Sequence, residues 1–181
     1  MNYLLRAMQS LPEYKPLLQA ALASRLPAAA TGLSHIHKAH LTAALASDAK
    51  RRVVFVAADE AEAARLSEDF AAFGFDTSTY PARDFTFRNV EGRSREYEHA
   101  RLGILSRMLE GNYGVILTTI DAASQYTLPP DALYTHILTY KTGQKISPEA
   151  VTAALLSGGY VRTEQVEGPG QFSRRGGILD F

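Results

Sequence analysis

The chain has 181 residues, 46% of them hydrophobic, and its 19 basic and 19 acidic side chains give a formal net charge of zero. The lack of cysteine excludes a disulfide framework and a thiolate zinc site, and no apolar run approaches the ~20 residues that cross a membrane. A neutral balance disfavours a dedicated nucleic-acid binder, which usually carries a basic excess. These features predict a packed, soluble, cytoplasmic protein.

The N-terminal part of the chain predicts helices followed by a glycine turn. Residues 2–24 have the pattern of one or two amphipathic helices that break near Pro12, since proline does not fit a helix interior. Residues 27–30 (PAAA), a turn at 31–34 (TGLS) and a helical pattern through Ala46 follow. They give the order strand, glycine turn, helix.

Two later segments have the pattern of parallel strands. Residues 52–57 (RVVFVA) are a near-continuous apolar run, typical of a strand buried on both faces. Asp59 is the predicted N-cap of a helix over 60–73 that Gly74 closes. Residues 113–118 (YGVILT) form a second buried-type run. The other predicted segments are strands at 75–80 and 133–140, irregular chain at 81–93, helices at about 94–110 and 119–125, and a loop at 128–130.

The pattern changes after residue 141. Ser147 is the predicted N-cap of a helix with Pro148 at its first position, and the helix ends at 158–159 (GG). The next segments are predicted as antiparallel strands around a turn: 160–166 and 172–181, with the turn at 168–170 (GPG). Because the chain stops inside the second of these strands, we expect the small domain to continue in a longer parent protein.

Repeated strand-helix-strand units favour a parallel sheet with helices on both faces. We therefore predict an α/β fold with a RecA/P-loop-like sheet, followed by the start of a small α+β domain. The predicted segments are N-terminal helices over 1–26, a degenerate RecA-like domain over 27–141 and a small domain over 142–181.

The glycine turn resembles a phosphate-binding loop that has lost essential parts. Such a loop takes two glycines, a lysine for the terminal phosphates and a Ser or Thr hydroxyl for Mg²⁺. Gly32 and Lys38 stand at the required spacing, whereas His37 replaces the second glycine and Ala39 replaces the hydroxyl residue. With Ser34, these residues predict a loop of structural role that does not hydrolyse nucleotide. The plainer reading of Lys38 is a solvated lysine near a helix N-terminus.

Three histidines, His35, His37 and His40, suggest a metal site. The last two lie one helical turn apart and share a predicted helix face. A hydrolytic site would need further ligands with ordered partners, and His99 and His136 have no ligand pattern beside them. Scattered exposed histidines are the favoured interpretation, and we predict neither a metal site nor a catalytic residue.

Basic and aromatic side chains alternate in the irregular segment that starts at Pro81. They are Arg83, Phe85, Phe87, Arg88, Arg93, Arg95 and Tyr97. Such alternation suits single-stranded nucleic acid, because bases stack on aromatic rings while cations meet phosphates. Acidic neighbours dilute the charge, so burial of Phe85 and Phe87 against the sheet is the favoured interpretation.

Several of these segments resemble one family, the transcription-repair coupling factors, in their UvrB-like N-terminal region. The segments that carry the resemblance are 54–70 (VFVAADEAEAARLSEDF), 80–85 (YPARDF) with Arg101-Leu102, 114–119 (GVILTT) with 128–130 (LPP), 158–160 (GGY), 165–167 (QVE) with Gly170, and 175–181 (RGGILDF). The last is the most specific. The resemblance covers most of the chain and is weakest over the first 25 residues.

The resemblance implies a division of labour between this region and the rest of a longer protein. UvrB has an intact phosphate loop, whereas the coupling factor carries a related module with a decayed loop, in agreement with His37 and Ala39 here. The ATP-driven translocase, with its ATP and Mg²⁺, lies further along the parent chain. The small domain is similar to the UvrB domain that binds UvrA. Arg175 matches the arginine implicated in that contact.

The predicted UvrA-binding residues are Arg162, Arg174, Arg175 and Glu167, with Glu164 as an extension of the patch. Arginine suits such an interface because its planar fork pairs bidentately with carboxylates. The alternative is that these are ordinary solvated hairpin residues, since charges at the rim of an interface contribute little. Gly176 and Gly177 are predicted to form a strand bulge or a close backbone contact.

The leading hypothesis is a module, itself without a cofactor, that recruits UvrA to a stalled transcription complex. RNA polymerase and double-stranded DNA are then partners through the full-length parent, and no membrane is involved. The first alternative is a nucleotide-dependent, helicase-like repair enzyme of the UvrB type, and the missing hydroxyl at Ala39 argues against it. The second is a metal hydrolase built on the three histidines.

Overall fold

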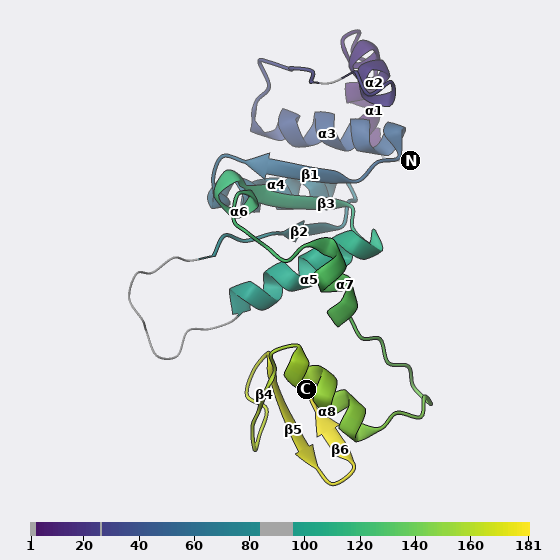
Figure 1. Cartoon of the computed structure of the whole chain (residues 1–181). Helices are drawn as coiled ribbons and strands as arrows, with labels where there is room; N and C mark the ends of the chain where they lie inside the picture. Colours follow the sequence, from purple (N-terminus) through teal and green to yellow (C-terminus); the bar gives the residue numbers. More distant parts are fainter. Residues whose placement is uncertain (1–2, 26, 84–95) are drawn as a thin grey trace. The chain divides into compact units, whose positions relative to one another are not determined.

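A computed structural model describes residues 3–25, 27–83 and 96–181 (Figure 1). The chain divides into two compact units. The first unit comprises Met1–Ala82 and Gly111–Gln125, and the second comprises Arg83–Glu110 and Tyr126–Phe181. These two units do not coincide with the three segments predicted from the sequence. The boundaries of those three segments remain predictions. Within the described residues, no helix is both long and apolar enough to cross a membrane.

The first unit is a parallel sheet with helices packed against it. Its elements are α1 (Tyr3–Gln9), α2 (Tyr14–Leu22), α3 (His35–Ala49), β1 (Val53–Ala57), α4 (Glu60–Ala72), β2 (Thr77–Thr79), β3 (Val115–Thr119) and α6 (Ile120–Ala123). The strand order is β1-β3-β2, and both outer strands run parallel to β3. This confirms an α/β fold with a parallel sheet.

Burial within this sheet depends on strand position. All five residues of β3 are buried, as expected of a central strand. On β1, Val54 and Val56 are 49% and 50% exposed, so its predicted burial on both faces is wrong. The reason is that alternate side chains of a strand point to opposite faces, and Val54 and Val56 lie on the face that is not part of the core cluster. Phe55 and Ala57, which point to the other face, belong to the core.

The core of the first unit lies between α3, α4 and the sheet. Ala39 and Ala43 of α3 are fully buried, and these small side chains let α3 and α4 pack closely. Phe70 of α4 packs edge-on against Phe55 and Phe75, with ring centroids 5.9 and 6.3 Å apart. The apolar faces of α3 and α4 therefore pack into the same core layer.

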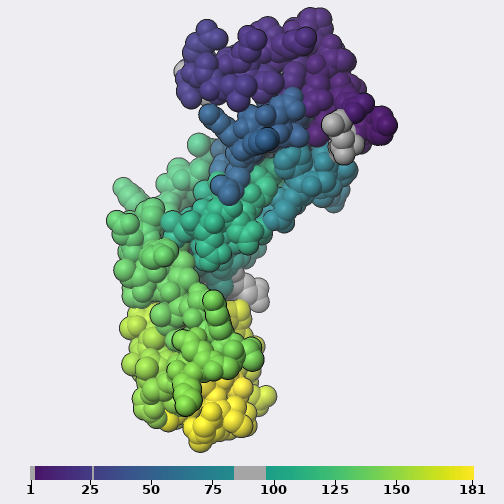
Figure 2. Space-filling view, turned by 90° about the vertical axis from the view of Figure 1, so that its right-hand side faces the viewer, coloured from purple at the N-terminus to yellow at the C-terminus, as the bar shows by residue number. Residues whose placement is uncertain are grey.

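Helices α1 and α2 lie against α3 (Figures 1 and 2). Leu5, Met8 and Tyr14 are buried there. The carboxylate of Asp48, on α3, accepts hydrogen bonds from the Tyr14 hydroxyl (2.7 Å) and the Gln9 amide (2.8 Å). One acidic side chain therefore joins all three helices.

Two predicted strands are wrong. Residues 27–30 have no regular secondary structure and are exposed, because this alanine-rich segment buries little apolar surface and pairs with no strand. The predicted strand at 133–140 is replaced by α7 (Pro130–His136) and irregular chain. Pro130 supplies a first helical position whose N–H is not needed, and Asp131 lies favourably in the first turn.

The second unit contains the small domain. Its elements are α5 (Glu96–Glu110), α7, α8 (Pro148–Ser157), β4 (Val161–Arg162), β5 (Gln171–Arg175) and β6 (Ile178–Asp180). Helix α8 begins as predicted, since the Ser147 hydroxyl accepts a hydrogen bond from the Ala150 N–H (3.3 Å). Its residues Val151 and Leu155 form a core with Phe172 of β5.

The strand pairing of the small domain differs from the prediction. β4 and β5 are parallel, whereas β5 and β6 form an antiparallel hairpin. The turn of that hairpin is Gly176–Gly177 rather than 168–170, and Gly176 has φ +61°. Two glycines suit a two-residue hairpin turn because its geometry requires positive φ. No atom lies within 4 Å of a Cβ built at either glycine, so the predicted bulge or close contact is also wrong.

Candidate functional site

A groove in the small domain brings together three of the predicted partner-binding residues. It has a volume of about 410 Å³ and is lined by Arg162, Thr163, Glu164, Ser173, Arg174 and Arg175. These residues come from β4, from the chain directly after it, and from β5. The strands thus place side chains 11 to 13 residues apart in sequence around one hollow.

The pairing of β4 with β5 explains how the groove forms. Arg162 is opposite Phe172, and β4 ends there while β5 continues to Arg175. The last residues of β5 therefore extend past the end of β4. Two hydrogen bonds hold the following chain against β5: the Thr163 N–H donates to the Phe172 carbonyl, and the Ser173 hydroxyl donates to the Glu164 carbonyl, both at 2.8 Å.

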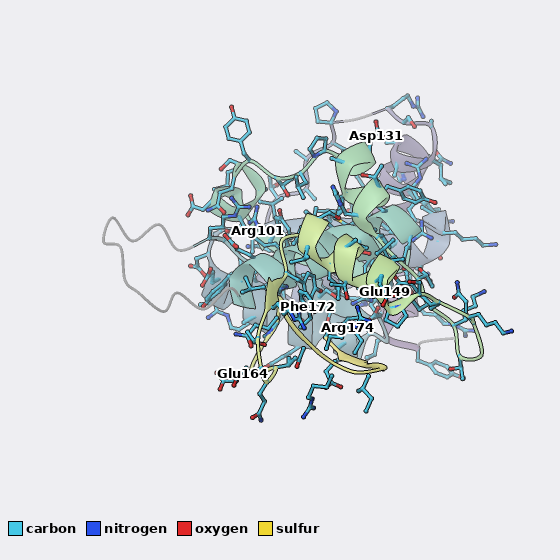
Figure 3. All side chains as sticks on the ribbon, turned by 60° about the horizontal axis from the view of Figure 1, so that its bottom comes forward. Arg101, Asp131, Glu149, Glu164, Phe172 and Arg174 are labelled. Atoms are coloured by element: carbon cyan, nitrogen blue, oxygen red, sulfur yellow. The ribbon has the colours of Figure 1, made fainter. Side chains whose placement is uncertain are left out.

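Arg174 is held in place by helix α8. Its guanidinium Nη2 donates a hydrogen bond to Glu149 Oε1 (Figure 3). Glu149 Oε2 also accepts from the Ser147 hydroxyl at 2.7 Å. These hydrogen bonds, with one from the Glu149 backbone, lower the pKa of Glu149 to about 2, and the bond from Ser147 contributes most. Glu149 is therefore ionised at neutral pH and pairs with Arg174.

The other two arginines of the groove are more available. The Arg175 side chain is 73% exposed, and its Nη2 lies 3.2 Å from Asp180 Oδ2 across the hairpin. Arg162 is exposed and forms no ion pair with any residue that the structure describes. A solvent-exposed pair such as Arg175–Asp180 contributes little stability and is easily exchanged for another carboxylate. The groove therefore presents two guanidinium groups to solvent.

Glu167 is not part of the groove. It is exposed, and its N–H donates to the Gln171 side chain at 2.8 Å. Sequence reasoning missed Glu149 as the partner of Arg174, and it missed Ser173, which is 3% exposed and fixes the groove wall. No local pattern marks Glu149, because it lies 25 residues before Arg174.

In the first unit, the lysine that follows the glycine turn is paired with a carboxylate of α4. Gly32 adopts φ +75°, which glycine allows. Lys38 Nζ donates to Glu62 Oε1 at 2.6 Å, and the Ala58 N–H donates to Glu62 Oε2 at 2.8 Å. The bond from Lys38 is the largest cause that lowers the pKa of Glu62. The retained lysine thus faces a carboxylate of the protein itself, which the sequence analysis missed.

Two further positions of the predicted phosphate loop are Ala39 and Ser34. Ala39, where a phosphate loop has its metal-binding hydroxyl, is fully buried in the core. The Ser34 hydroxyl lies 3.0 Å from His37 Nδ1 and makes no capping bond to α3. A methyl group packed in the core offers no ligand to Mg²⁺.

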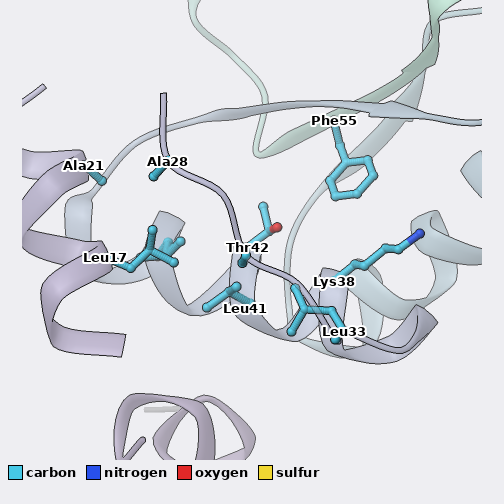
Figure 4. A pocket seen from close by; sticks show the side chains of 11 residues that line it. Leu17, Ala21, Ala28, Leu33, Lys38, Leu41, Thr42 and Phe55 are labelled. Carbon is cyan, nitrogen blue, oxygen red and sulfur yellow. The ribbon is translucent and has the colours of Figure 1, made fainter. Parts of the chain in front are cut away.

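A cavity of about 590 Å³ lies beside this turn, between α2, α3 and β1 (Figure 4). Leu17, Ala21, Leu41 and Phe55 are among the residues that line it, and Lys38 and Thr42 supply the polar side chains. Figure 4 shows Lys38 extending away from Leu17 and Ala21. The walls of this cavity are therefore mainly apolar.

The three histidines of α3 have separate surroundings. His35 Nε2 lies 3.3 Å from Asp69 Oδ2, His37 contacts Ser34, and the His40 ring stacks on Phe73 at 5.0 Å. Among the described residues, no group of three or more His, Asp or Glu side chains is arranged to hold a metal ion. The predicted basic and aromatic segment falls largely on 84–95, outside the described residues.

Comparison with known proteins identifies similar chains. Residues 138–181, which contain the arginine groove, match the family described as the UvrB interaction domain. The transcription-repair-coupling factor of Bacillus subtilis is 25% identical over 152 residues, and that of Staphylococcus epidermidis is 27% identical over 153 residues. Each alignment covers 83% of this chain and 13% of the relative.

The chain therefore spans a small part of the length of these relatives. The domain match covers the C-terminal end of the chain, and the alignments with the relatives cover most of it. They confirm the resemblance read from the sequence: the chain is similar to transcription-repair coupling factors, and its residues 138–181 match the UvrB interaction domain.

Proposed function

We propose that this chain is the protein-interaction module of a transcription-repair coupling factor, and that it recruits UvrA in transcription-coupled nucleotide excision repair. The groove that contains Arg162, Arg174 and Arg175 is the contact surface. The supporting observation is that Arg162 of β4 and the adjacent Arg174 and Arg175 of β5 line one groove inside the segment that matches the UvrB interaction domain.

The charges of the groove suggest how a partner binds. Arg174 is fixed by Glu149 and sets the shape of the wall. Arg162 and Arg175 are exposed and offer donors to carboxylates of UvrA. Charge-assisted bonds of arginine to carboxylate are about twice as strong as neutral ones. We infer an acidic contact surface on the partner.

The remaining expectations concern the parent protein and the first unit. The sheet β1-β3-β2 is part of a RecA-like domain that does not hydrolyse nucleotide, in keeping with the Lys38–Glu62 pair and the buried Ala39. ATP and Mg²⁺ act in the motor domains of the parent, a cytoplasmic translocase that contacts RNA polymerase and double-stranded DNA. No observation favours the UvrB-type enzyme.

Calorimetric titration of this chain with purified UvrA tests the proposal. Arg162→Ala and Arg175→Ala each weaken binding by about tenfold, which corresponds to about 1.4 kcal/mol of binding free energy. The matched control is Lys145→Ala, which removes an exposed cation of the same segment outside the groove and leaves binding unchanged. The effect of the arginines decreases at high salt, because exposed charges are screened.

Two results would contradict the proposal. The first is no binding of UvrA by the folded chain and by the full parent protein. The second is binding that Lys145→Ala weakens as much as Arg175→Ala does, since this would indicate a diffuse electrostatic attraction instead of a defined groove.

A further inference from the structure

Two donors of the first unit converge on one carboxylate. Lys38 Nζ bonds one oxygen of Glu62 and the Ala58 N–H bonds the other, at 2.6 and 2.8 Å. Glu62 is 9% exposed. A buried charge is costly unless it is paired and hydrogen-bonded, so these two donors are what makes an ionised carboxylate acceptable at this place.

The two donors lie at places where α/β proteins commonly bind anions: the carboxyl end of a parallel strand and the start of the helix after a glycine turn. Ala58 directly follows the last residue of β1, at the carboxyl end of a parallel strand. Ligands of open α/β sheets bind outside the carboxyl ends of strands. Lys38 lies in the first turns of α3, directly after the glycine turn, where a phosphate loop holds its lysine.

We propose that Lys38 and the Ala58 N–H form an anion-binding cradle, and that Glu62 fills it in place of a phosphate group. The cradle accepts inorganic phosphate or pyrophosphate once the Glu62 carboxylate is removed. Glu62 therefore acts as a built-in occupant that keeps external anions out. This inference concerns the first unit and is independent of the UvrA groove in the second.

Other polar and charged groups lie close to the Glu62 carboxylate. His35 Nδ1 lies 3.9 Å from Glu62 Oε1, and His35 Nε2 lies 3.3 Å from Asp69 Oδ2. Asp59 Oδ1 accepts the Glu62 N–H, and the Glu62 carboxylate accepts the Ala58 N–H just before the cap, so the two side chains cap the start of α4 reciprocally. The pKa of Glu62 is lowered, with the bond from Lys38 as the largest cause, and the carboxylate stays charged at neutral pH.

An ordinary salt bridge between α3 and α4 makes a different prediction. In that case Lys38, whose side chain is 43% exposed, turns to solvent when Glu62 is removed, and no anion site opens. The two interpretations differ in one measurable property, which is whether a Glu62 variant gains affinity for phosphate.

The test measures phosphate and pyrophosphate binding by calorimetry and by ³¹P NMR. Glu62→Ala empties the cradle, and Glu62→Gln removes the charge but keeps the side-chain shape and an acceptor for the Ala58 N–H. Glu60→Gln is the matched control, because Glu60 is an exposed carboxylate in the same turn of α4. Circular dichroism verifies that each variant keeps the native helix content.

We expect Glu62→Ala to bind pyrophosphate at least tenfold more tightly than the unmodified chain and Glu60→Gln do. The double variant Lys38→Met/Glu62→Ala loses this gain. The inference is overturned if folded Glu62→Ala and Glu62→Gln bind no better than the unmodified chain. It is also overturned if the double variant binds as well as Glu62→Ala, since the anion would then not lie at Lys38.

Discussion

Arg174 on β5 donates a hydrogen bond to Glu149 in the first turn of α8, 25 residues earlier in the chain. This contact holds the strand against the helix and leaves the neighbouring Arg175 exposed to solvent. Two adjacent arginines thus have different surroundings: Arg174 pairs with a residue of α8, and Arg175 is exposed to solvent.

The first prediction separates these roles by stability. Arg174→Ala lowers the melting temperature of the small domain, because it removes the charge-assisted hydrogen bond to Glu149 that joins β5 to α8. Arg175→Ala leaves the melting temperature nearly unchanged, since exposed pairs contribute little. Thermal melts followed by circular dichroism measure both, and a larger effect of Arg175→Ala would contradict the assignment.

The second prediction concerns pH. The pKa of Glu149 in the folded chain, about 2, lies below its ordinary value of 4.5. The folded state therefore binds fewer protons, so the contribution of Glu149 to stability is complete above pH 4.5 and is lost as the pH falls toward 2. Carbon-13 NMR of the side-chain carboxyl tests this directly. Glu149→Gln lacks this part of the acid sensitivity, and a titration midpoint near 4.5 would refute the prediction.

The third prediction concerns the core of the small domain. Phe172 is fully buried between α8 and the strands, so Phe172→Ala lowers the free energy of unfolding by about 3–5 kcal/mol. Ile178 is 64% exposed, and Ile178→Ala changes the free energy of unfolding by less than about 0.5 kcal/mol. Hydrogen exchange of the α8 amides measures the stability of this core in the two variants. Equal protection of these amides from exchange in Phe172→Ala and Ile178→Ala would contradict the prediction.

The fourth prediction compares two helix caps. The Asp59 side chain accepts the Glu62 N–H at 2.7 Å, whereas Ser34 makes no capping bond to α3. Asp59→Ala therefore lowers the free energy of unfolding by about 1 kcal/mol, and Ser34→Ala has little effect. Urea unfolding measures the free energy of unfolding of both variants. Similar losses in the two would contradict the prediction that the Asp59 cap stabilises α4.

The fifth prediction concerns the contact between α2 and α3. Tyr14→Phe removes the bond to Asp48 and lowers the free energy of unfolding by about 1 kcal/mol. Burial, with the bond to Asp48, raises the pKa of the Tyr14 hydroxyl above 10, so the folded state keeps a proton that the unfolded state loses. Stability from this group is complete below pH 10 and declines above it. Alkaline unfolding of Tyr14→Phe lacks this decline; an unchanged alkaline profile would contradict the prediction.

The sequence by itself determined the elements that carry strong local signals. The apolar run around Val115 specified the central strand, because a strand flanked on both sides has no polar face. Asp59 and Ser147 specified the starts of α4 and α8, because a capping side chain bonds a backbone N–H three residues away. Arg162, Arg174 and Arg175 were selected through the family resemblance and not through geometry.

The tertiary structure decided which of these residues meet. Local pattern did not distinguish the parallel pairing of β4 with β5 from a simple hairpin, and it did not show that Lys38 faces Glu62 or that Arg174 faces Glu149. Each of these contacts joins residues of different elements. Periodicity reports how a segment buries its own face, but the partner of a charge depends on which segments the packed core brings side by side.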